Sequence, residues 1–263
     1  MARPICARID LSALRGNLAV ARHAAGGGKL WAVVKANAYG HGLMRVAGAL
    51  GDLADGFALL DLGDAIALRE AGFRQPLLLL EGFFEADELP LYAEYRLTPV
   101  LHVLDQVDML MHAALPARLP VYLKLNTGMN RLGFSAEAFD PVLTALATSP
   151  NVSSVTLMTH FADADLERGI AWQMERFAEA TQGCGQPVSL ANSAALLRFP
   201  DSRQGWARPG IMLYGATPFS HATRSAVSLK LKPAMTLSTE IIGVQALKAG
   251  DRVGYGATYV ASK

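Results

Sequence analysis

Short apolar runs alternate along the chain with longer segments that carry apolar residues on one face only. The short runs are continuously apolar, which is typical of strands that are covered on both faces, as in a parallel sheet. We predict strands at 29–35, 56–60, 76–80, 97–103, 120–125, 152–159, 188–191 and 206–214.

The segments between these strands have helical spacing. Residues 64–71 place apolar side chains three and four positions apart and end at Gly72, a natural C-cap. Residues 135–147 begin with Ser135 as a candidate N-cap and continue with helically spaced apolar residues. A third helix is predicted at 167–182.

Strand and helix alternate about eight times, and this alternation predicts an α/β fold of the (β/α)8 TIM-barrel type over residues 1–224. The length of 263 residues suits such a barrel, which commonly needs about 250 residues. A doubly wound open sheet is the competing architecture. It requires a glycine-rich dinucleotide turn after the first strand, and the sequence has none there.

The pattern changes after Pro218. Residues 229–244 contain two alternating runs rich in β-branched side chains, and residues 248–252 follow as a turn. We therefore expect residues 225–263 to begin a C-terminal antiparallel β domain, and we expect that domain to be incomplete at Lys263.

Composition narrows the possible partners. Hydrophobic residues make up 51% of the chain and charged residues 18%, and the net charge is +1, which favours neither nucleic acid nor an acidic membrane as a partner. The first residues lack the apolar run of a secretory signal, and no stretch reaches the roughly 20 apolar residues of a membrane helix. Cys6 and Cys184 form no metal-ligand pattern and are read as ordinary thiols. A cytoplasmic enzyme without a metal is the expectation.

Polar side chains fall at the carboxyl ends of the predicted strands, where barrels of this type carry their reactive groups. These are Lys35, Lys124, His160, Asn192, Ser193 and Arg208. Any one of them alone is more often a solvated or structural residue, but their joint placement indicates a site. Backbone amides at Gly210 and Ile211, after the last strand, would suit a phosphate group.

Six blocks of sequence carry a family resemblance. Residues 32–42 read AVVKANAYGHG and residues 123–133 read LKLNTGMNRLG; THF follows at 159–161, ANSAA at 191–195, RPGI at 208–211 and VGYGATY at 253–259. In this order the blocks resemble those of alanine racemases, which are barrel enzymes that depend on pyridoxal 5′-phosphate. The resemblance runs nearly the whole length of the chain.

The resemblance implies a catalytic mechanism with two bases. Lys35 would form a Schiff base with pyridoxal 5′-phosphate, alanine would replace it to give an external aldimine, and the freed amine would exchange the proton on one face of Cα. Tyr255 would exchange the proton on the other face, and in relatives it serves the site of the other subunit, so a homodimer is implied. Without the family, Tyr255 would be read as an ordinary strand-edge tyrosine.

The resemblance also assigns binding roles. It implies that Arg208 faces the pyridine nitrogen, which favours proton exchange over decarboxylation or transamination. Cofactor contacts are further implied for Tyr39, Asn192, Ser193, Gly210 and Ile211. Arg131 and His160 are expected beside the cofactor, with Arg131 also binding the substrate carboxylate. Lys124 matches a lysine that is carbamylated in some relatives.

Alternatives to interconversion of L- and D-alanine stay open at this point. The chain could be a barrel racemase or decarboxylase for larger amino acids, although Arg208 argues against a decarboxylase. It could also be a non-catalytic cofactor-binding protein of the same barrel type, although such proteins end with the barrel and lack a counterpart of Tyr255. A further alternative is a barrel fragment that binds pyridoxal 5′-phosphate without turnover. D-Alanine formation would supply peptidoglycan precursors, and the reverse direction would serve D-alanine catabolism.

Overall fold

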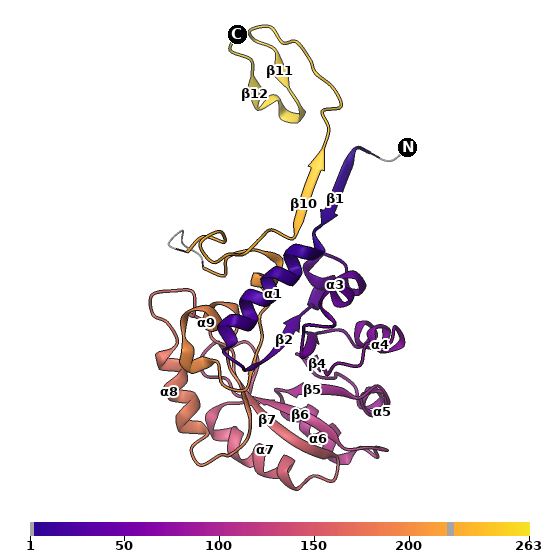
Figure 1. Ribbon diagram of the computed structural model, residues 1–263, viewed down its shortest axis with the longest axis vertical. Helices are drawn as coiled ribbons and strands as arrows, with labels where there is room; N and C mark the ends of the chain where they lie inside the picture. Colours follow the sequence, from indigo (N-terminus) through magenta and orange to yellow (C-terminus); the bar gives the residue numbers. More distant parts are fainter. Residues whose placement is uncertain (1–2, 220–223) are drawn as a thin grey trace. The chain divides into compact units, whose positions relative to one another are not determined.

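Eight parallel strands form a nearly closed barrel in this computed structural model, which describes residues 3–219 and 224–263. They pair in the order β8-β7-β6-β5-β4-β3-β2-β9, so that each strand lies beside its neighbour in sequence (Figure 1). Their bounds are β2 Lys29–Val33, β3 Gly56–Leu59, β4 Leu77–Leu79, β5 Leu97–Leu101, β6 Leu119–Lys124, β7 Val152–Met158, β8 Val188–Ser189 and β9 Trp206–Ala207.

The barrel closes between its two shortest strands, β8 and β9. Asn192 and Arg208 form an isolated parallel bridge just beyond these strands. The amide of Arg208 donates to the carbonyl oxygen of Ala191 at 2.8 Å. The closing seam therefore lies at the carboxyl end of the barrel, where the predicted site residues are concentrated.

Helices follow most of the strands and cover the outside of the barrel (Figure 1). They are α1 Leu11–Ala25, α2 Lys35–Tyr39, α3 Leu43–Leu50, α4 Leu62–Glu70, α5 Leu89–Glu94, α6 Leu104–His112, α7 Ala136–Thr148, α8 Ala171–Ala180 and α9 Ser193–Arg198, with 3₁₀ turns η1 Ala86–Glu88, η2 Pro200–Ser202 and η3 Ile211–Tyr214. Several begin with the caps their sequences suggest, since Asp10, Asp61, Ser135 and Asn192 each accept a hydrogen bond from a backbone amide in the first turn.

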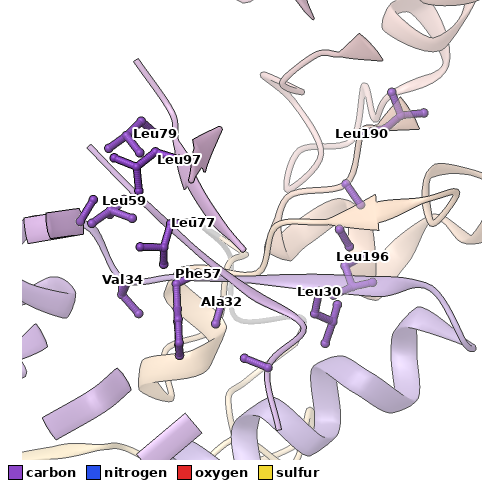
Figure 2. Packing of buried hydrophobic residues seen from close by; sticks show 14 of the residues in the cluster. Leu30, Ala32, Val34, Phe57, Leu59, Leu77, Leu79, Leu97, Leu190 and Leu196 are labelled. Carbon is purple, nitrogen blue, oxygen red and sulfur yellow. The ribbon is translucent and has the colours of Figure 1, made fainter. Parts of the chain in front are cut away.

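The continuously apolar strands divide their side chains between two cores. On β2, Leu30 and Ala32 face the helices, whereas Trp31 and Val33 face the interior of the barrel. Figure 2 shows the outer core, in which Leu30, Ala32 and Val34 lie with leucines and a phenylalanine from neighbouring strands. The interior core also contains Ala58, Leu78, Val100, Tyr122 and Met158. Burial on both faces explains why these strands lack an alternating sequence pattern.

The predicted (β/α)8 barrel is confirmed, and a strand is present in each of the eight predicted segments. Most strands are a few residues shorter than expected. The strand expected at 206–214 is limited to Trp206–Ala207, because residues 211–214 form the 3₁₀ turn η3. The helix expected at 64–71 spans Leu62–Glu70, and Ser135 caps the helix expected at 135–147. The helix expected at 167–182 begins only at Ala171. One of the two strand-like runs in 229–244 forms a strand, β10 Met235–Thr239, whereas residues 240–248 have no strand partner and stay irregular.

Residues 3–8 and 236–263 form a second compact unit, separate from the unit of residues 9–219 and 224–235 that contains the barrel. Strand β1 Ile5–Ile9, which the sequence pattern did not indicate, pairs with β10. Strands β11 Arg252–Val253 and β12 Tyr259–Val260 form an antiparallel pair around the 3₁₀ turn η4 Tyr255–Ala257. A division into domains at residues 224 and 225 stays a prediction.

No helix within residues 3–219 and 224–263 combines the length and apolarity needed to cross a membrane.

Candidate active site

A pocket of about 440 Å³ opens at the carboxyl ends of the barrel strands. Ten of the residues predicted to form a site line it, although they come from six separate places in the chain. They are Lys35, Tyr39, Lys124, Arg131, His160, Asn192, Ser193, Arg208, Gly210 and Ile211. The barrel topology brings these residues together because parallel strands end at the same rim.

Lys35 enters the pocket from an unusual stretch of backbone. It follows β2 and begins α2, in which Ala36, Asn37, Ala38 and Tyr39 all have φ between 52° and 54°. A left-handed conformation costs an L-residue roughly 1–2 kcal/mol, so four in succession must be held by their surroundings. Asn37 contributes by accepting a hydrogen bond from the amide of Leu43 at 2.8 Å, which ties the turn to α3. The turn directs both Lys35 and Tyr39 to the pocket.

Tyr39, Ser193 and Gly210 converge at one side of the pocket. The Gly210 amide donates to the Ser193 hydroxyl at 2.9 Å. The Tyr39 hydroxyl lies so close to Gly210 that a Cβ atom there would stand 2.6 Å from it, so a larger residue at position 210 would have to displace the Tyr39 side chain. Burial raises the pKa of Tyr39, which therefore stays a neutral hydrogen-bond donor. The amide of Ile211 opens η3 and has no hydrogen bond to any described residue. The hydroxyls of Tyr39 and Ser193 and the free amide of Ile211 meet beside Gly210 and thus form a cradle for an anion, here named the cradle of Tyr39, Ser193 and Gly210.

Arg208 is 4% exposed and lies at the closing seam. Its Nη1 donates to the carbonyl and hydroxyl oxygens of Ser189 at 2.7 and 2.6 Å, and its Nη2 donates to the carbonyls of Thr159 and Leu190 at 2.5 and 3.2 Å. A guanidinium has five N–H donors. Of these, only the Nε–H has no acceptor among the described residues, and it is available to the pocket. Burial lowers the pKa of Arg208 to about 10, so the group stays charged at neutral pH.

Positive charge dominates the pocket. Lys35, Lys124, Arg131 and Arg208 line it together with only two acidic residues, Glu81 and Asp165. Burial, followed by repulsion from Arg208 and Arg131, lowers the pKa of Lys124 to about 8. Burial and the same two arginines, with Lys124, also hold the pKa of His160 well below its usual value, so this imidazole is neutral. The pocket therefore favours a ligand that carries negative charge.

Several lining residues were not singled out from the sequence. Glu81 lies two residues after the end of β4, and Asp165 lies five residues after His160. Glu81 occupies the same kind of strand-end position as Lys35 and Lys124, so the strand-end rule could have found it. Met129, Leu132 and Phe161 supply apolar walls and lie inside the blocks that carried the family resemblance.

Tyr255 is the predicted site residue that does not belong to the barrel unit. It lies in η4 of the second unit and is fully exposed. Its role stays a prediction.

The fold and the pocket define an α/β-barrel protein with a lysine and a buried arginine in a cationic site. Residues 9–218 match the family model described as alanine racemase, N-terminal domain. The chain is 52% identical to an alanine racemase of Erwinia tasmaniensis, covering 100% of this chain and 73% of that protein. It is also 52% identical to a catabolic alanine racemase of Salmonella typhimurium, covering 98% of this chain and 72% of the relative.

Among solved structures, the biosynthetic alanine racemase from Pseudomonas aeruginosa superimposes with a TM-score of 0.95 at 43% identity, covering 100% of this chain and 73% of that one. The alanine racemase from Acinetobacter baumannii matches with a TM-score of 0.90 at 36% identity, and the match covers 100% of this chain and 74% of the Acinetobacter chain. The chain belongs to the alanine racemase family, whose members are isomerases, and it is shorter than these relatives.

The lowered pKa of Lys124 predicts how stability depends on pH. In the folded state the amine loses its proton near pH 8, whereas in the unfolded chain it does so near 10.5. Between these values the unfolded state binds more protons, so folding becomes more favourable as pH rises through this window. Below pH 8 the buried charge is fully present and costs at most about 3 kcal/mol.

Lys124→Met should therefore raise the free energy of unfolding at pH 7 by about 1–3 kcal/mol, and this gain should shrink toward pH 10. Urea unfolding measures this gain in the free energy of unfolding. The buffer is freed of carbon dioxide so that the amine of Lys124 stays unmodified. Lys29→Met, which removes an exposed lysine at the other end of the barrel, is the matched control. A gain that is independent of pH would contradict the assignment of the buried charge to Lys124.

Proposed function

We propose that this chain interconverts L- and D-alanine with pyridoxal 5′-phosphate bound in the barrel pocket. The observation that carries the proposal is that one cationic pocket contains an amine, Lys35, together with the cradle of Tyr39, Ser193 and Gly210. The names of the relatives support alanine as the substrate.

The residues of the pocket fit this cofactor. A phosphate group suits the cradle, where the free amide of Ile211 and the neutral hydroxyl of Tyr39 can donate to it. An aldehyde requires an amine in a shaped, partly buried place, and Lys35 is half-buried. When bound, pyridoxal phosphate supplies an electron-withdrawing ring that acidifies the hydrogen on the Cα atom of an amino acid.

Lys35 and Tyr255 are the proposed proton carriers. The Lys35 amine would hold the cofactor covalently and, when free, would take or return the Cα proton on one face. The Tyr255 hydroxyl does so on the opposite face, and we propose that it serves the pocket of a second subunit in a homodimer. Two carriers on opposite faces allow a proton to leave from one side and return on the other, which inverts the configuration of Cα.

Arg208 favours this proton exchange over other reactions. Four of its five donors are used by backbone carbonyls and the Ser189 hydroxyl, so the Nε–H is the donor that can meet a ring nitrogen in the pocket. Because a guanidinium donates and keeps its proton, it would leave such a nitrogen without a proton of its own, which would weaken the electron withdrawal that the ring supplies. Weaker withdrawal suits removal and return of a proton more than decarboxylation.

Arg131 and His160 are proposed to bind on the substrate side. The Arg131 guanidinium can hold the carboxylate of alanine, and the neutral His160 imidazole can accept or donate a hydrogen bond beside it.

Asn192 caps α9 through its side chain and thereby fixes Ser193 at the cradle. These roles agree with an enzyme of the cytoplasm that provides D-alanine for peptidoglycan or consumes it.

We also propose that Lys124 is carbamylated. Its pKa of about 8 leaves part of the amine neutral at physiological pH, as attack on carbon dioxide requires. The modification replaces the Lys124 cation by an anion and so turns the repulsion of Lys124 by Arg131 and Arg208 into attraction. In ¹³C-bicarbonate the protein should show one carbamate resonance that Lys124→Met lacks. A spectrum without that resonance would rule the modification out.

The Lys35 proposal is tested with the cofactor alone. Lys35→Ala should lose the visible absorption band of covalently held pyridoxal phosphate, and borohydride treatment should then leave the peptide containing position 35 unlabelled. Lys29→Ala, at the opposite end of β2, should keep both the band and the label. A band that persists in Lys35→Ala would overturn the central assignment.

Tyr255 is tested by isotope exchange and by mixing subunits. Tyr255→Phe should slow deuterium incorporation from D₂O unequally for the two enantiomers of alanine. If the tyrosine serves the other subunit, mixing inactive Lys35→Ala with inactive Tyr255→Phe should restore about a quarter of the original activity, since half of the dimers then contain one intact site. Equal, undiminished exchange from both enantiomers would remove Tyr255 from the reaction.

A further inference from the structure

Within residues 3–219 and 224–263, neither the Arg131 guanidinium nor the His160 ring makes a hydrogen bond or an ion pair. Arg131 lies on the segment 125–134 between β6 and α7, here named the Arg131 loop, and His160 lies just beyond β7. Their positions in the pocket therefore depend on how the backbone of these two segments is fixed.

The Arg131 loop is closed at its base but needs support along its length. The Asn126 amide donates to the Phe134 carbonyl and the Phe134 amide donates to the Lys124 carbonyl, both at 2.8 Å. Between these ends, Gly128 and Asn130 have φ values of 128° and 57°. Their amides both donate to the Asn126 side-chain oxygen at 3.0 Å, so the loop is partly held from within. The rest of its support comes from contacts made from outside the loop.

Gln173 on α8 supplies those contacts. It is completely buried, and its amide joins both segments: Nε2 donates to the Thr127 hydroxyl at 2.8 Å and to the His160 carbonyl at 3.2 Å, while Oε1 accepts from the Ala162 amide at 2.7 Å. The partners fix the orientation of the side chain, because rotation by 180° would set donor against donor and acceptor against acceptor.

The hydrogen bonds continue from Gln173 in one direction. The Thr159 hydroxyl donates to the Leu125 carbonyl at 3.0 Å, so it must accept the 2.8 Å hydrogen bond from the Thr127 hydroxyl, which itself accepts from Gln173. Both threonines are buried. The carbonyl of Thr159 accepts from Arg208 at 2.5 Å. A single amide on α8 is therefore connected to the Arg131 loop, to the segment of His160 and to the backbone that holds Arg208.

Packing around Gln173 reinforces the connection. Its neighbour Trp172 covers Gly128 so closely that a Cβ atom at that position would lie 2.3 Å from the indole ring. Arg176, one turn further along α8, donates to the Thr127 carbonyl at 3.3 Å. The first turns of α8 thus contact the Arg131 loop at both its side chains and its backbone.

We propose that Gln173 is a positioning residue that sets Arg131 and His160 for the substrate carboxylate. This inference rests on the proposed racemase function. It assigns no chemical step to Gln173, whose amide acts only by holding the two backbone segments in register. Loss of the amide should loosen the carboxylate-binding side of the pocket and leave the cradle of Tyr39, Ser193 and Gly210 intact.

The test compares Gln173→Met with Asn151→Leu. Each replaces a buried amide by an apolar side chain of similar size, and Asn151 makes comparable hydrogen bonds, to the carbonyls of Leu110 and Ala113 at 2.8 and 2.7 Å. Asn151 precedes β7, whereas two of the partners of Gln173, His160 and Ala162, follow it, so the control lies at the opposite end of the same strand. Both variants should lower the melting temperature.

Only Gln173→Met should accelerate amide hydrogen exchange in residues 125–134 and 159–163, by about tenfold. It should also raise KM for alanine by about tenfold with a smaller change in kcat, while the affinity for pyridoxal phosphate stays within about twofold. Thr127→Val, which removes only the hydroxyl, is a milder second variant that should change exchange in the same segments.

Unchanged exchange in those segments, or a loss in kcat with KM unaltered, would overturn the positioning role. If the unsubstituted chain has no turnover, the racemase proposal fails, and the exchange comparison alone then decides whether Gln173 holds the two segments.

Discussion

The buried guanidinium of Arg208 is the constraint on which the rest of the site depends. It lies where β8 and β9 close the barrel, and four of its hydrogen bonds go to the carbonyls and the hydroxyl of the seam. The hydrogen bonds at the seam where the barrel closes therefore also fix the position of this positive charge. No carboxylate among the described residues pairs with this buried charge, and the charge is tolerated because neutral oxygens satisfy its donors.

The charge of Arg208 then acts on its neighbours. With burial, it lowers the pKa of Lys124 to about 8 and holds His160 neutral. A pocket with this excess of positive charge is unfavourable for the protein alone and becomes favourable when an anion enters. The electrostatics of the folded chain thus agree with a ligand that brings a phosphate and a carboxylate.

The sequence predicted the barrel well because its strands are buried on both faces and so stand out as short, continuously apolar runs. It also found the strand-end residues Lys35, Lys124 and His160, since a barrel gathers such ends at one rim. The specific roles came from the family resemblance rather than from spacing. Arg208 illustrates this, because its sequence position shows neither its burial nor the carbonyls that hold it.

What the sequence did not predict depends on contacts between distant segments. Strand β1 exists through its pairing with β10, more than two hundred residues away, and no local pattern marks it. Gln173 reads as a polar residue within an amphipathic helix, yet it is wholly buried. Its importance becomes visible only when the loops after β6 and β7 are placed beside α8. Glu81 was a different kind of omission, since its position after β4 follows the same rule as the residues that were found.

The left-handed turn after Lys35 has a consequence for protein design. The turn is formed by residues 36–39 with side chains, not by glycines, and its backbone is stable only against α3 and the pocket wall. A designer who transplanted the lysine alone onto another barrel strand would obtain the amine without its direction of approach. The smallest transferable unit is the strand end, the turn and the helix that restrains it, so this reactive group is encoded as a supersecondary motif rather than as a residue.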